Sequence, residues 1–148
     1  MMSPTYWSAV DGNVTRSVIL DGELAVSDEH GRSVYASIMK RRQDVRYYAF
    51  DLLWLNGKDL RRLPLLARKQ MLKRLLPKRS THVLYVDHLK GDGSTLYRIA
   101  CQMDLEGIVA KKVDSPYEDH WTHPYWIKIK TPNYSQNEGR ADLFKQAG

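Results

Sequence analysis

LEGIVAKK at residues 105–112 and YWIKIK at residues 125–130 predict two strands joined by a polar loop, and the expected fold is organised around them. In the second strand, alternation places Trp126, Lys128 and Lys130 on one face and the remaining, largely apolar side chains on the other. We therefore expect one face to belong to the core and the opposite face to be a charged surface.

Glu106 stands at the start of the first of these strands, and Lys128 and Lys130 lie in the second. A carboxylate can bind a divalent cation while two ammonium groups neutralise the oxygens of a polyphosphate. The alternative is an ordinary edge strand with solvated lysines, because lysine on an exposed edge opposes pairing with other chains. The pattern of residues by itself leaves both interpretations open.

Four ordered blocks of sequence resemble motifs of the ATP-dependent DNA ligases. Residues 106–111 followed by 126–130 are similar to the fourth and fifth nucleotidyltransferase motifs of that family. Upstream, LDGEL at residues 20–24 resembles a family strand, and YAFDLLWLNG at residues 48–57 resembles the third motif. The resemblance runs from about Val18 to Lys130 and is closest to the bacterial ligases associated with double-strand break repair. Four blocks in the family order are far more specific than one block.

The resemblance implies an α+β fold with antiparallel-rich sheets and packed helices, as in a partial nucleotidyltransferase adenylation domain of ATP-grasp-like type. This domain is expected at residues 17–131, between an N-terminal arm at 1–16 and a tail at 132–148. The resemblance also implies ATP and Mg²⁺ or Mn²⁺ as cofactors. Its implied site residues are Glu23 on the ribose, Phe50 on the adenine, Glu106 on the metal, and Lys128 and Lys130 as catalytic, phosphate-binding residues.

The lysine nucleophile of the family is absent from its expected place. Family ligases attack the ATP α-phosphate with the lysine of a K-x-D-G-x-R motif upstream of the LDGEL strand, whereas residues 1–18 contain no lysine. Residues 90–93 spell KGDG, but they follow the third motif, and Thr95 stands where the motif has arginine. A turn before a helix is the favoured interpretation of Lys90.

Two further departures concern the loop and the end of the chain. The arginine that usually follows the Ser-x-Tyr element of the family is missing after Tyr117, and residues 131–148 are too few for the oligonucleotide-binding barrel of the ligases. Asp119, His120 and His123 are crowded in one loop and are interpreted as solvated residues rather than as a metal site.

Because of these departures, we expect the chain to be part of a ligase for DNA repair and recombination and to be inactive by itself. The alternative is a non-catalytic module that binds ATP or nicked DNA, or a partner of a full-length ligase or another repair subunit. RNA ligases and capping guanylyltransferases share the fold but are ranked last.

Composition agrees with a nucleic-acid partner. The chain has 148 residues and a net charge of +6, which suits weak, phosphate-mediated contact with nicked or broken DNA. This length predicts one domain with its own core. The single cysteine, Cys101, lies in an apolar helical pattern, and its side chain is expected to be packed in the core. A single cysteine cannot form an internal disulfide, which fits a reducing compartment. No apolar run is long enough to span a membrane, and the expected location is the cytoplasm.

The remaining elements follow from periodicity and turn residues. Residues 1–16 show no period and are expected to be a loose arm, whereas 17–26 predicts a strand that returns as a hairpin through 33–35. Residues 45–55 are nearly all apolar or aromatic and predict a central strand that ends at Asn56-Gly57.

Beyond this turn, Pro64 begins an amphipathic helix that continues to Leu76. A strand at 82–89 and a helix at 95–103 capped by Ser94 follow. Basic residues that could approach DNA are expected on exposed faces: Lys40, Arg41, Arg42, Arg68, Lys69, Lys73 and Arg74.

Overall fold

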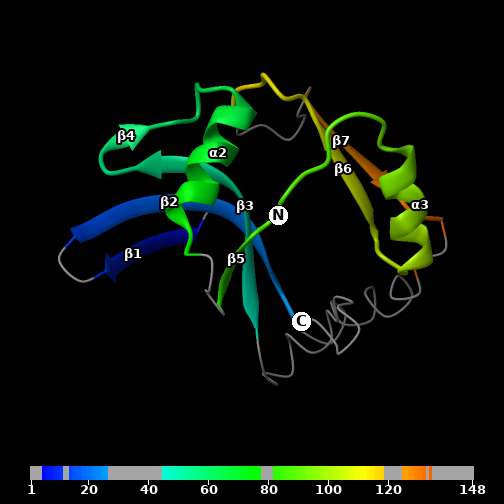
Figure 1. Cartoon of the computed structure of the whole chain (residues 1–148), viewed down its shortest axis with the longest axis horizontal. Coiled ribbons are helices and arrows are strands. Elements are labelled where there is room, and N and C mark those ends of the chain that lie inside the picture. Colours follow the sequence, from blue (N-terminus) through cyan, green and yellow to red (C-terminus); the bar gives the residue numbers. More distant parts are fainter. Residues whose placement is uncertain are drawn as a thin grey trace, which may run out of the picture. The chain divides into compact units, whose positions relative to one another are not determined.

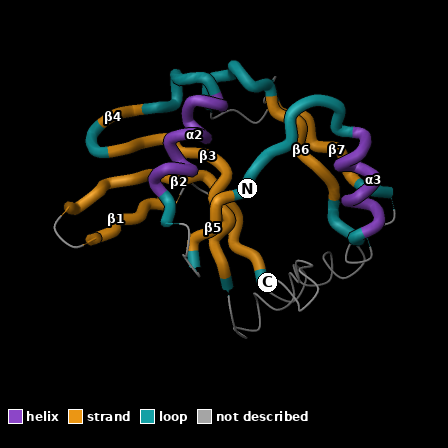
Figure 2. The backbone as a smooth tube through the Cα atoms, in the orientation of Figure 1, coloured by secondary structure: helices purple, strands orange, loops and turns teal. Residues whose placement is uncertain are grey.

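The computed structural model describes residues 5–11, 14–26, 45–77, 82–118, 125–132 and 134 of the chain. The chain forms two compact units, a division that length and composition did not indicate. Unit 1 comprises residues 1–88 and 111–125, and unit 2 comprises residues 89–110 and 126–148. The fold is α+β, as expected from the sequence, and its elements are drawn in Figures 1 and 2.

Unit 1 is built on one sheet with the order β1-β2-β3-β4, in which β5 also pairs with β3 (Figure 1). The first three strands pair antiparallel, and β5 runs parallel to β3. The strands are β1 (Thr5–Asp11), β2 (Val14–Ala25), β3 (Arg46–Leu55), β4 (Lys58–Asp59) and β5 (Val83–Tyr85). The expected central strand is therefore confirmed, since β3 has neighbours on both sides.

The turn after β3 forms because both of its residues adopt positive φ. Asn56 has φ 48° and Gly57 has φ 86°, as a two-residue hairpin turn of type I′ requires. The side chain of Asn56 also accepts a hydrogen bond from the backbone N of Ser17, at 3.2 Å, which ties the turn to β2. The predicted end of the central strand is thus confirmed.

Helix α2 (Leu65–Leu75) packs on the sheet and closes the core of unit 1. Leu72 of the helix is fully buried with Leu52 of β3, and Leu20 of β2 is 2% exposed. The helix begins after Pro64 as predicted, because proline fixes a φ that suits a helix start. Its last turn carries Lys73 and Arg74, whose charges suit the negative end of the helix dipole.

Unit 2 contains helix α3 (Ser94–Gln102) and a two-stranded sheet of β6 (Gly107–Lys111) and β7 (Trp126–Lys130), except that Lys111, the last residue of β6, belongs to unit 1. Backbone N–H groups of Lys112 and Thr131 donate to the carbonyls of Tyr125 and Glu106, at 2.9 Å each. These bonds join opposite ends of the two strands, so the strands run antiparallel, and the predicted framing of a loop by two strands is confirmed.

Several local expectations are wrong. Residues 5–11 and 14–16 are strand residues rather than a loose arm, because β1 pairs antiparallel with β2, whereas the strand expected from residue 17 onward is confirmed as the rest of β2. The strand expected at 82–89 is shorter and covers Val83–Tyr85, which pair with Tyr47–Ala49 of β3. Among the described residues, backbone hydrogen bonds to β3 extend it only to His82 and Val86. Helix α3 starts at Ser94, with Gly93 in the cap position, so Ser94 is not the cap.

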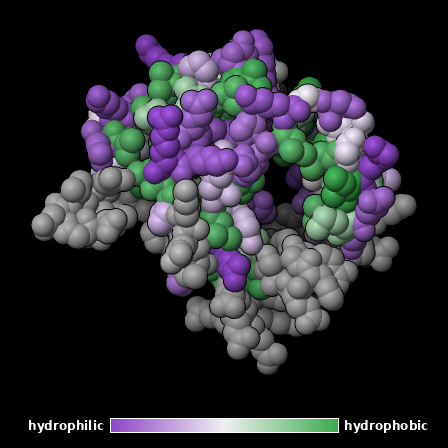
Figure 3. All heavy atoms as spheres, viewed as in Figure 1, coloured by the Kyte–Doolittle hydropathy of each residue, from purple (hydrophilic) through white to green (hydrophobic). Residues whose placement is uncertain are grey.

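The surfaces of α3 and β7 also differ from expectation. Cys101 is exposed, and Ala100 is the buried residue of α3. The apolar face of β7 is not a core face, because Ile127 is 63% and Ile129 is 39% exposed. Hydrophobic side chains accordingly show at the surface around α3, β6 and β7 in Figure 3.

Other predictions lie outside the described residues: the hairpin return at 33–35, the basic run of Lys40, Arg41 and Arg42, and the loop residues Asp119, His120 and His123. Within the part of the chain that the structure describes, neither helix has the length and apolar composition that crossing a membrane requires.

Candidate functional site

Phe50 is presented by an irregularity in the central strand. The register between β2 and β3 steps from Asp21 opposite Asp51 to Gly22 opposite Ala49, so Phe50 is the extra residue of a β-bulge. A bulge re-aims the side chain that it carries and takes its backbone out of the ladder. The ring of Phe50 is half-buried, whereas Ala49 and Asp51 on either side are fully buried.

Lys111, the last residue of β6, places its ammonium over the Phe50 ring. The Nζ atom lies 4.3 Å from the ring centroid, which is within the range of a cation–π contact. Burial lowers the pKa of Lys111 to about 8, although the negative charges of Asp51 and Asp21 act in the opposite direction. Lys111 lies within the fourth motif, but the sequence did not indicate that it would contact Phe50.

Asp51 and Arg68 form a buried ion pair beneath this contact. The guanidinium donates to both carboxylate oxygens, at 2.8 Å from Nε and 2.9 Å from Nη2, and neither side chain is exposed. Arg68 was expected on the outer face of the helix, and that expectation is wrong. The buried carboxylate on β3 draws the arginine inward, because a buried charge needs a partner.

Lys69 was also expected to be solvated and is also buried. Its Nζ donates to the carbonyls of Phe50, at 3.3 Å, and Val86, at 2.8 Å. Burial lowers the pKa of Lys69, and Asp51 partly offsets this effect. Lys69 therefore links the bulge at Phe50 to the residue that follows β5, Val86. Lys73 remains at the surface and pairs with Asp87 at 2.8 Å.

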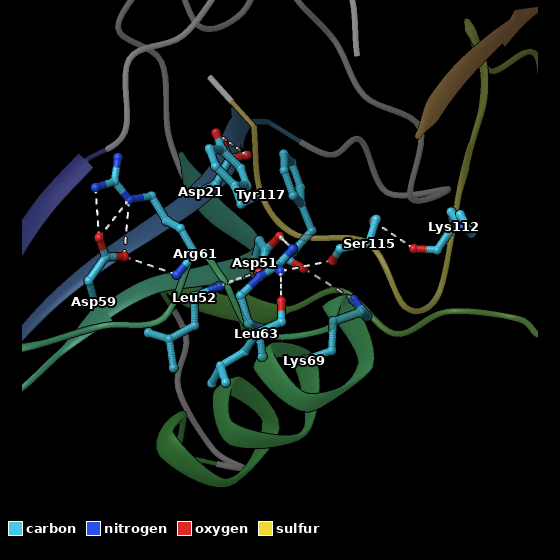
Figure 4. A network of polar contacts seen from close by, with 12 residues as sticks. Asp21, Asp51, Leu52, Asp59, Arg61, Leu63, Lys69, Lys112, Ser115 and Tyr117 are labelled. Atoms are coloured by element: carbon cyan, nitrogen blue, oxygen red, sulfur yellow. Dashed lines mark hydrogen bonds and ion pairs between the residues drawn. The ribbon is translucent and has the colours of Figure 1, made fainter. Parts of the chain in front are cut away.

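The segment 112–118 is fastened to α2 and to the sheet. Figure 4 shows Ser115 and Asp51 within one network of polar contacts, with Tyr117 facing Asp21. The hydroxyl of Tyr117 donates to Asp21 at 3.1 Å, and Arg68 donates to the carbonyl of Ser115 at 3.1 Å. Burial raises the pKa of Asp21, while Lys111 and the Tyr117 hydroxyl limit the rise.

Glu23, the candidate ribose ligand, lies on β2 opposite Tyr48 and has an exposed side chain. Glu23 follows Gly22, which pairs with Ala49 directly after the bulge. Because Gly22 has no side chain, the two strands can approach closely there. A Cβ atom at Gly22 would lie 2.6 Å from the carbonyl oxygen of Tyr48. Glu23 and Phe50 therefore lie on adjacent strands of unit 1 beside the same irregular step.

In unit 2 the candidate metal ligand and one candidate phosphate ligand are brought together. The Nζ of Lys128 donates to the Oε1 of Glu106 at 2.8 Å. Lys130 lies two residues along β7 and has an exposed side chain, and its carbonyl accepts a hydrogen bond from the Tyr97 hydroxyl at 3.3 Å. Lys128 and Lys130 thus share one face of the strand, as the alternation predicted.

A divalent cation fits the chemistry of Glu106 only with help from other ligands. The described residues contain no group of three or more histidine, cysteine, aspartate or glutamate side chains that could hold a metal. Carboxylate oxygen suits Mg²⁺, which proteins commonly hold through one or two carboxylates together with substrate phosphates. The residues are therefore compatible with a metal that arrives with a polyphosphate, and such a metal would meet Glu106 already paired with Lys128.

Lys90 lies in a turn, as the favoured interpretation of KGDG required. Gly91 has φ 104°, and the Asp92 carboxylate accepts from the backbone N of Ser94 at 3.0 Å, which starts α3. Lys90 is exposed in this turn.

Comparison of the sequence with known protein families finds a match over most of the chain. The family model described as "ATP dependent DNA ligase domain" matches residues 4–130. A multifunctional non-homologous end joining protein LigD of Mycolicibacterium smegmatis is 35% identical over 118 residues, which cover 78% of the chain and 15% of that protein. The SPbeta prophage-derived DNA ligase-like protein LigB of Bacillus subtilis is 28% identical over 133 residues, which cover 86% of the chain and 49% of LigB.

Solved structures agree with these relatives. The ligase domain of LigD from Mycobacterium tuberculosis has a TM-score of 0.66 and 32% identity, with 78% of this chain and 38% of that one covered. A mycobacterial DNA ligase D complexed with ATP and MES has a TM-score of 0.67, also at 32% identity. The chain therefore spans about 15% of the LigD protein of M. smegmatis and 38% of the solved ligase domain of M. tuberculosis LigD.

Proposed function

The chain belongs to the ATP-dependent DNA ligase family, and on this premise we propose that it binds ATP reversibly as the adenylation portion of a DNA repair ligase. In this proposal it does not form a covalent lysyl-AMP by itself. The first lysine of the sequence is Lys40, so no lysine precedes the LDGEL strand, where the nucleophile of the family would stand. The proposed location is the cytoplasm, where DNA is accessible.

The observation that carries the proposal is the pairing of Glu106 with Lys128 beside Lys130. We assign Lys128 and Lys130 to phosphate oxygens, because each can form a charge-assisted hydrogen bond. An arriving Mg²⁺–triphosphate offers both partners of the ion pair a new counter-charge, the cation for Glu106 and the phosphates for Lys128. Mg²⁺ would supply charge neutralisation on the triphosphate when bound.

The other roles follow the same family assignment. Phe50 is assigned to the adenine base, since stacking on an aromatic ring contributes about 1 to 3 kcal/mol per base in nucleic-acid binders. Glu23 is assigned to the ribose, whose hydroxyl hydrogens a carboxylate can accept. Its exposed side chain is available to a ligand without breaking the core.

Titration of the purified chain with ATP and Mg²⁺ in a calorimeter tests this proposal. Replacing Lys128 and Lys130 together by alanine removes two contacts worth roughly 1.5 to 3 kcal/mol each, so the affinity should fall by at least about a hundredfold. Lys58→Ala, an exposed lysine on β4, is the matched control and should leave the affinity unchanged. Equal affinity of the double variant and the parent protein would remove both lysines from the site.

A second candidate function is a non-catalytic module that binds nicked DNA or joins a full-length ligase. Binding requires no nucleophile, so this candidate does not depend on a lysine before residue 20. It predicts nick-specific, salt-resistant DNA binding, whereas the first proposal predicts ATP binding and only weak DNA contact. A gel-shift comparison of nicked and intact duplexes distinguishes the two.

A further inference from the structure

The Lys111 ammonium covers a face of the Phe50 ring on which an adenine base could stack. The ammonium lies 4.3 Å from the ring centroid, about the distance at which a stacked base would lie. One face of an aromatic ring cannot hold both. We propose that Lys111 is a built-in competitor of the adenine base for Phe50, so that nucleotide binding requires displacement of its ammonium; this inference rests on the proposed role of Phe50.

Charges on β2, β3 and α2 act on this ammonium. Asp21 of β2 and Asp51 of β3 attract it, whereas Arg68 and Lys69 of α2 repel it. Asp51 is already paired with Arg68, and Asp21 accepts a hydrogen bond from Tyr117. The two carboxylates that attract Lys111 are thus each partly neutralised by another group.

The backbone that carries the Phe50 ring is held by a hydrogen bond from Lys69. The Phe50 carbonyl is held by Lys69, which in turn bonds Val86, so the ring is anchored through its backbone. Lysine, by contrast, carries its charge on a flexible stem of four methylene groups. An arriving base is therefore expected to move the lysine and leave the ring in place.

Protonation of Lys111 adds a second readout. Its pKa of about 8 means that the ammonium loses its proton as the pH rises from 7 to 9, and a neutral amine has no cation–π attraction to the ring. The affinity of the parent protein for adenine should rise across this interval. A variant without the lysine should lack this component of the pH dependence.

Adenosine is the appropriate probe, because it carries the base and ribose but no phosphate that Lys128 or Lys130 could bind. The ¹⁵N-labelled chain is titrated with adenosine at pH 7 and followed by the amide shifts of Phe50 and its neighbours. Lys111→Met, which keeps the length and apolar stem, should bind adenosine about threefold to thirtyfold more tightly, the range that a cation–π contact spans.

Two further variants make the outcome decisive. Lys112→Met removes the adjacent lysine, whose Nζ lies 5.7 Å from the Tyr125 centroid, and should bind adenosine as the parent does. Phe50→Leu keeps an apolar side chain without the stacking surface and should abolish most of the binding. Equal or weaker adenosine binding by Lys111→Met, with dependence on Phe50 retained, overturns the competition and leaves the nucleotide site standing. If Phe50→Leu binds adenosine as well as the parent protein does, both the adenine site at Phe50 and the competition by Lys111 are refuted.

Discussion

Arg68 donates to both carboxylate oxygens of Asp51 inside unit 1, where neither side chain reaches solvent. The same guanidinium also donates to the carbonyls of Leu63 and Ser115. One buried cation thus joins the central strand, the start of α2 and the segment after β6. Because desolvated charges are costly when unpaired, this network is expected to dominate the response of unit 1 to mutation.

Arg68→Leu should destabilise the protein by about 3 to 5 kcal/mol, since it leaves the Asp51 carboxylate buried without its counter-charge. Urea unfolding followed by circular dichroism measures the change. Arg74→Leu, an exposed residue of the same helix, should shift stability by no more than about 0.5 kcal/mol. The double change of Asp51 and Arg68 to leucine should recover part of the loss. A cost below about 1 kcal/mol for Arg68→Leu would contradict the importance of the pair.

Gly107→Ala should disrupt the pairing of β6 with β7. A Cβ atom at this position would lie 2.1 Å from the carbonyl oxygen of Ile129 and 2.9 Å from the Cα of Lys130, so backbone has to move. We expect a loss of about 1 to 3 kcal/mol and faster hydrogen exchange of β7 amides. Gly93→Ala is the control, because its added Cβ would make an ordinary contact of 3.7 Å with Ile108. Equal exchange rates in the two variants would speak against this geometry.

The pKa of Lys111 makes stability depend on pH in a defined direction. Its folded value of about 8 lies below the usual 10.5, so between these values the unfolded chain binds more protons than the folded chain. This lysine therefore makes the free energy of unfolding rise with pH across that window. Lys111→Met should lose this rise, on the order of 2 kcal/mol, in urea titrations from pH 7 to 10. Parallel pH profiles of variant and parent would show that Lys111 titrates normally.

Covalent chemistry is expected to be absent from the chain as given. Incubated with α-³²P-labelled ATP and Mg²⁺, the protein should retain no label through a denaturing gel, because no lysine precedes the LDGEL strand. Lys90 is exposed in the turn before α3 and is not expected to react. Retained label that disappears in Lys90→Ala would reverse the assignment of KGDG as a turn.

DNA binding should be weak and strongly salt-dependent. Arg68 and Lys69 are buried and contribute little to phosphate contact, so α2 offers fewer cations than its sequence indicates. For about two to four phosphate contacts, the logarithm of the affinity should fall with the logarithm of the salt concentration at a slope of roughly −2 to −4. Anisotropy titrations on nicked and intact duplexes give the slope. Tight, nick-specific binding at physiological salt would instead favour the dedicated binding module.

The sequence predicted what depends on local pattern. The continuous apolar run of β3, the Asn56-Gly57 turn and the helix after Pro64 are all encoded by neighbouring residues, and the structure confirms them. Strand β1 was missed although the signal was present, since Gly12-Asn13 separates two runs rich in β-branched and aromatic residues.

The sequence did not predict what depends on distant partners. Helical periodicity assigns Arg68 and Lys69 to a polar face, and only the carboxylate of Asp51 and the carbonyls of Phe50 and Val86 explain their burial. The contact of Lys111 with Phe50 joins residues from different elements and has no local signature. The roles of Glu23, Glu106, Lys128 and Lys130 toward a nucleotide stay predictions.

The first turn of α2 has an implication for synthesis on the ribosome. Backbone N–H groups of Leu65 and Leu66 donate to the carbonyls of Ser115, at 2.9 Å, and Val113, at 3.1 Å, so the start of the helix is completed by residues made almost fifty positions later. A nascent chain that has emerged only to His88 can pair its strands but exposes these donors to water. Unit 1 is therefore expected to complete its fold only after the segment 112–118 has left the exit tunnel. Until then, the incomplete unit is a potential substrate for ribosome-associated chaperones.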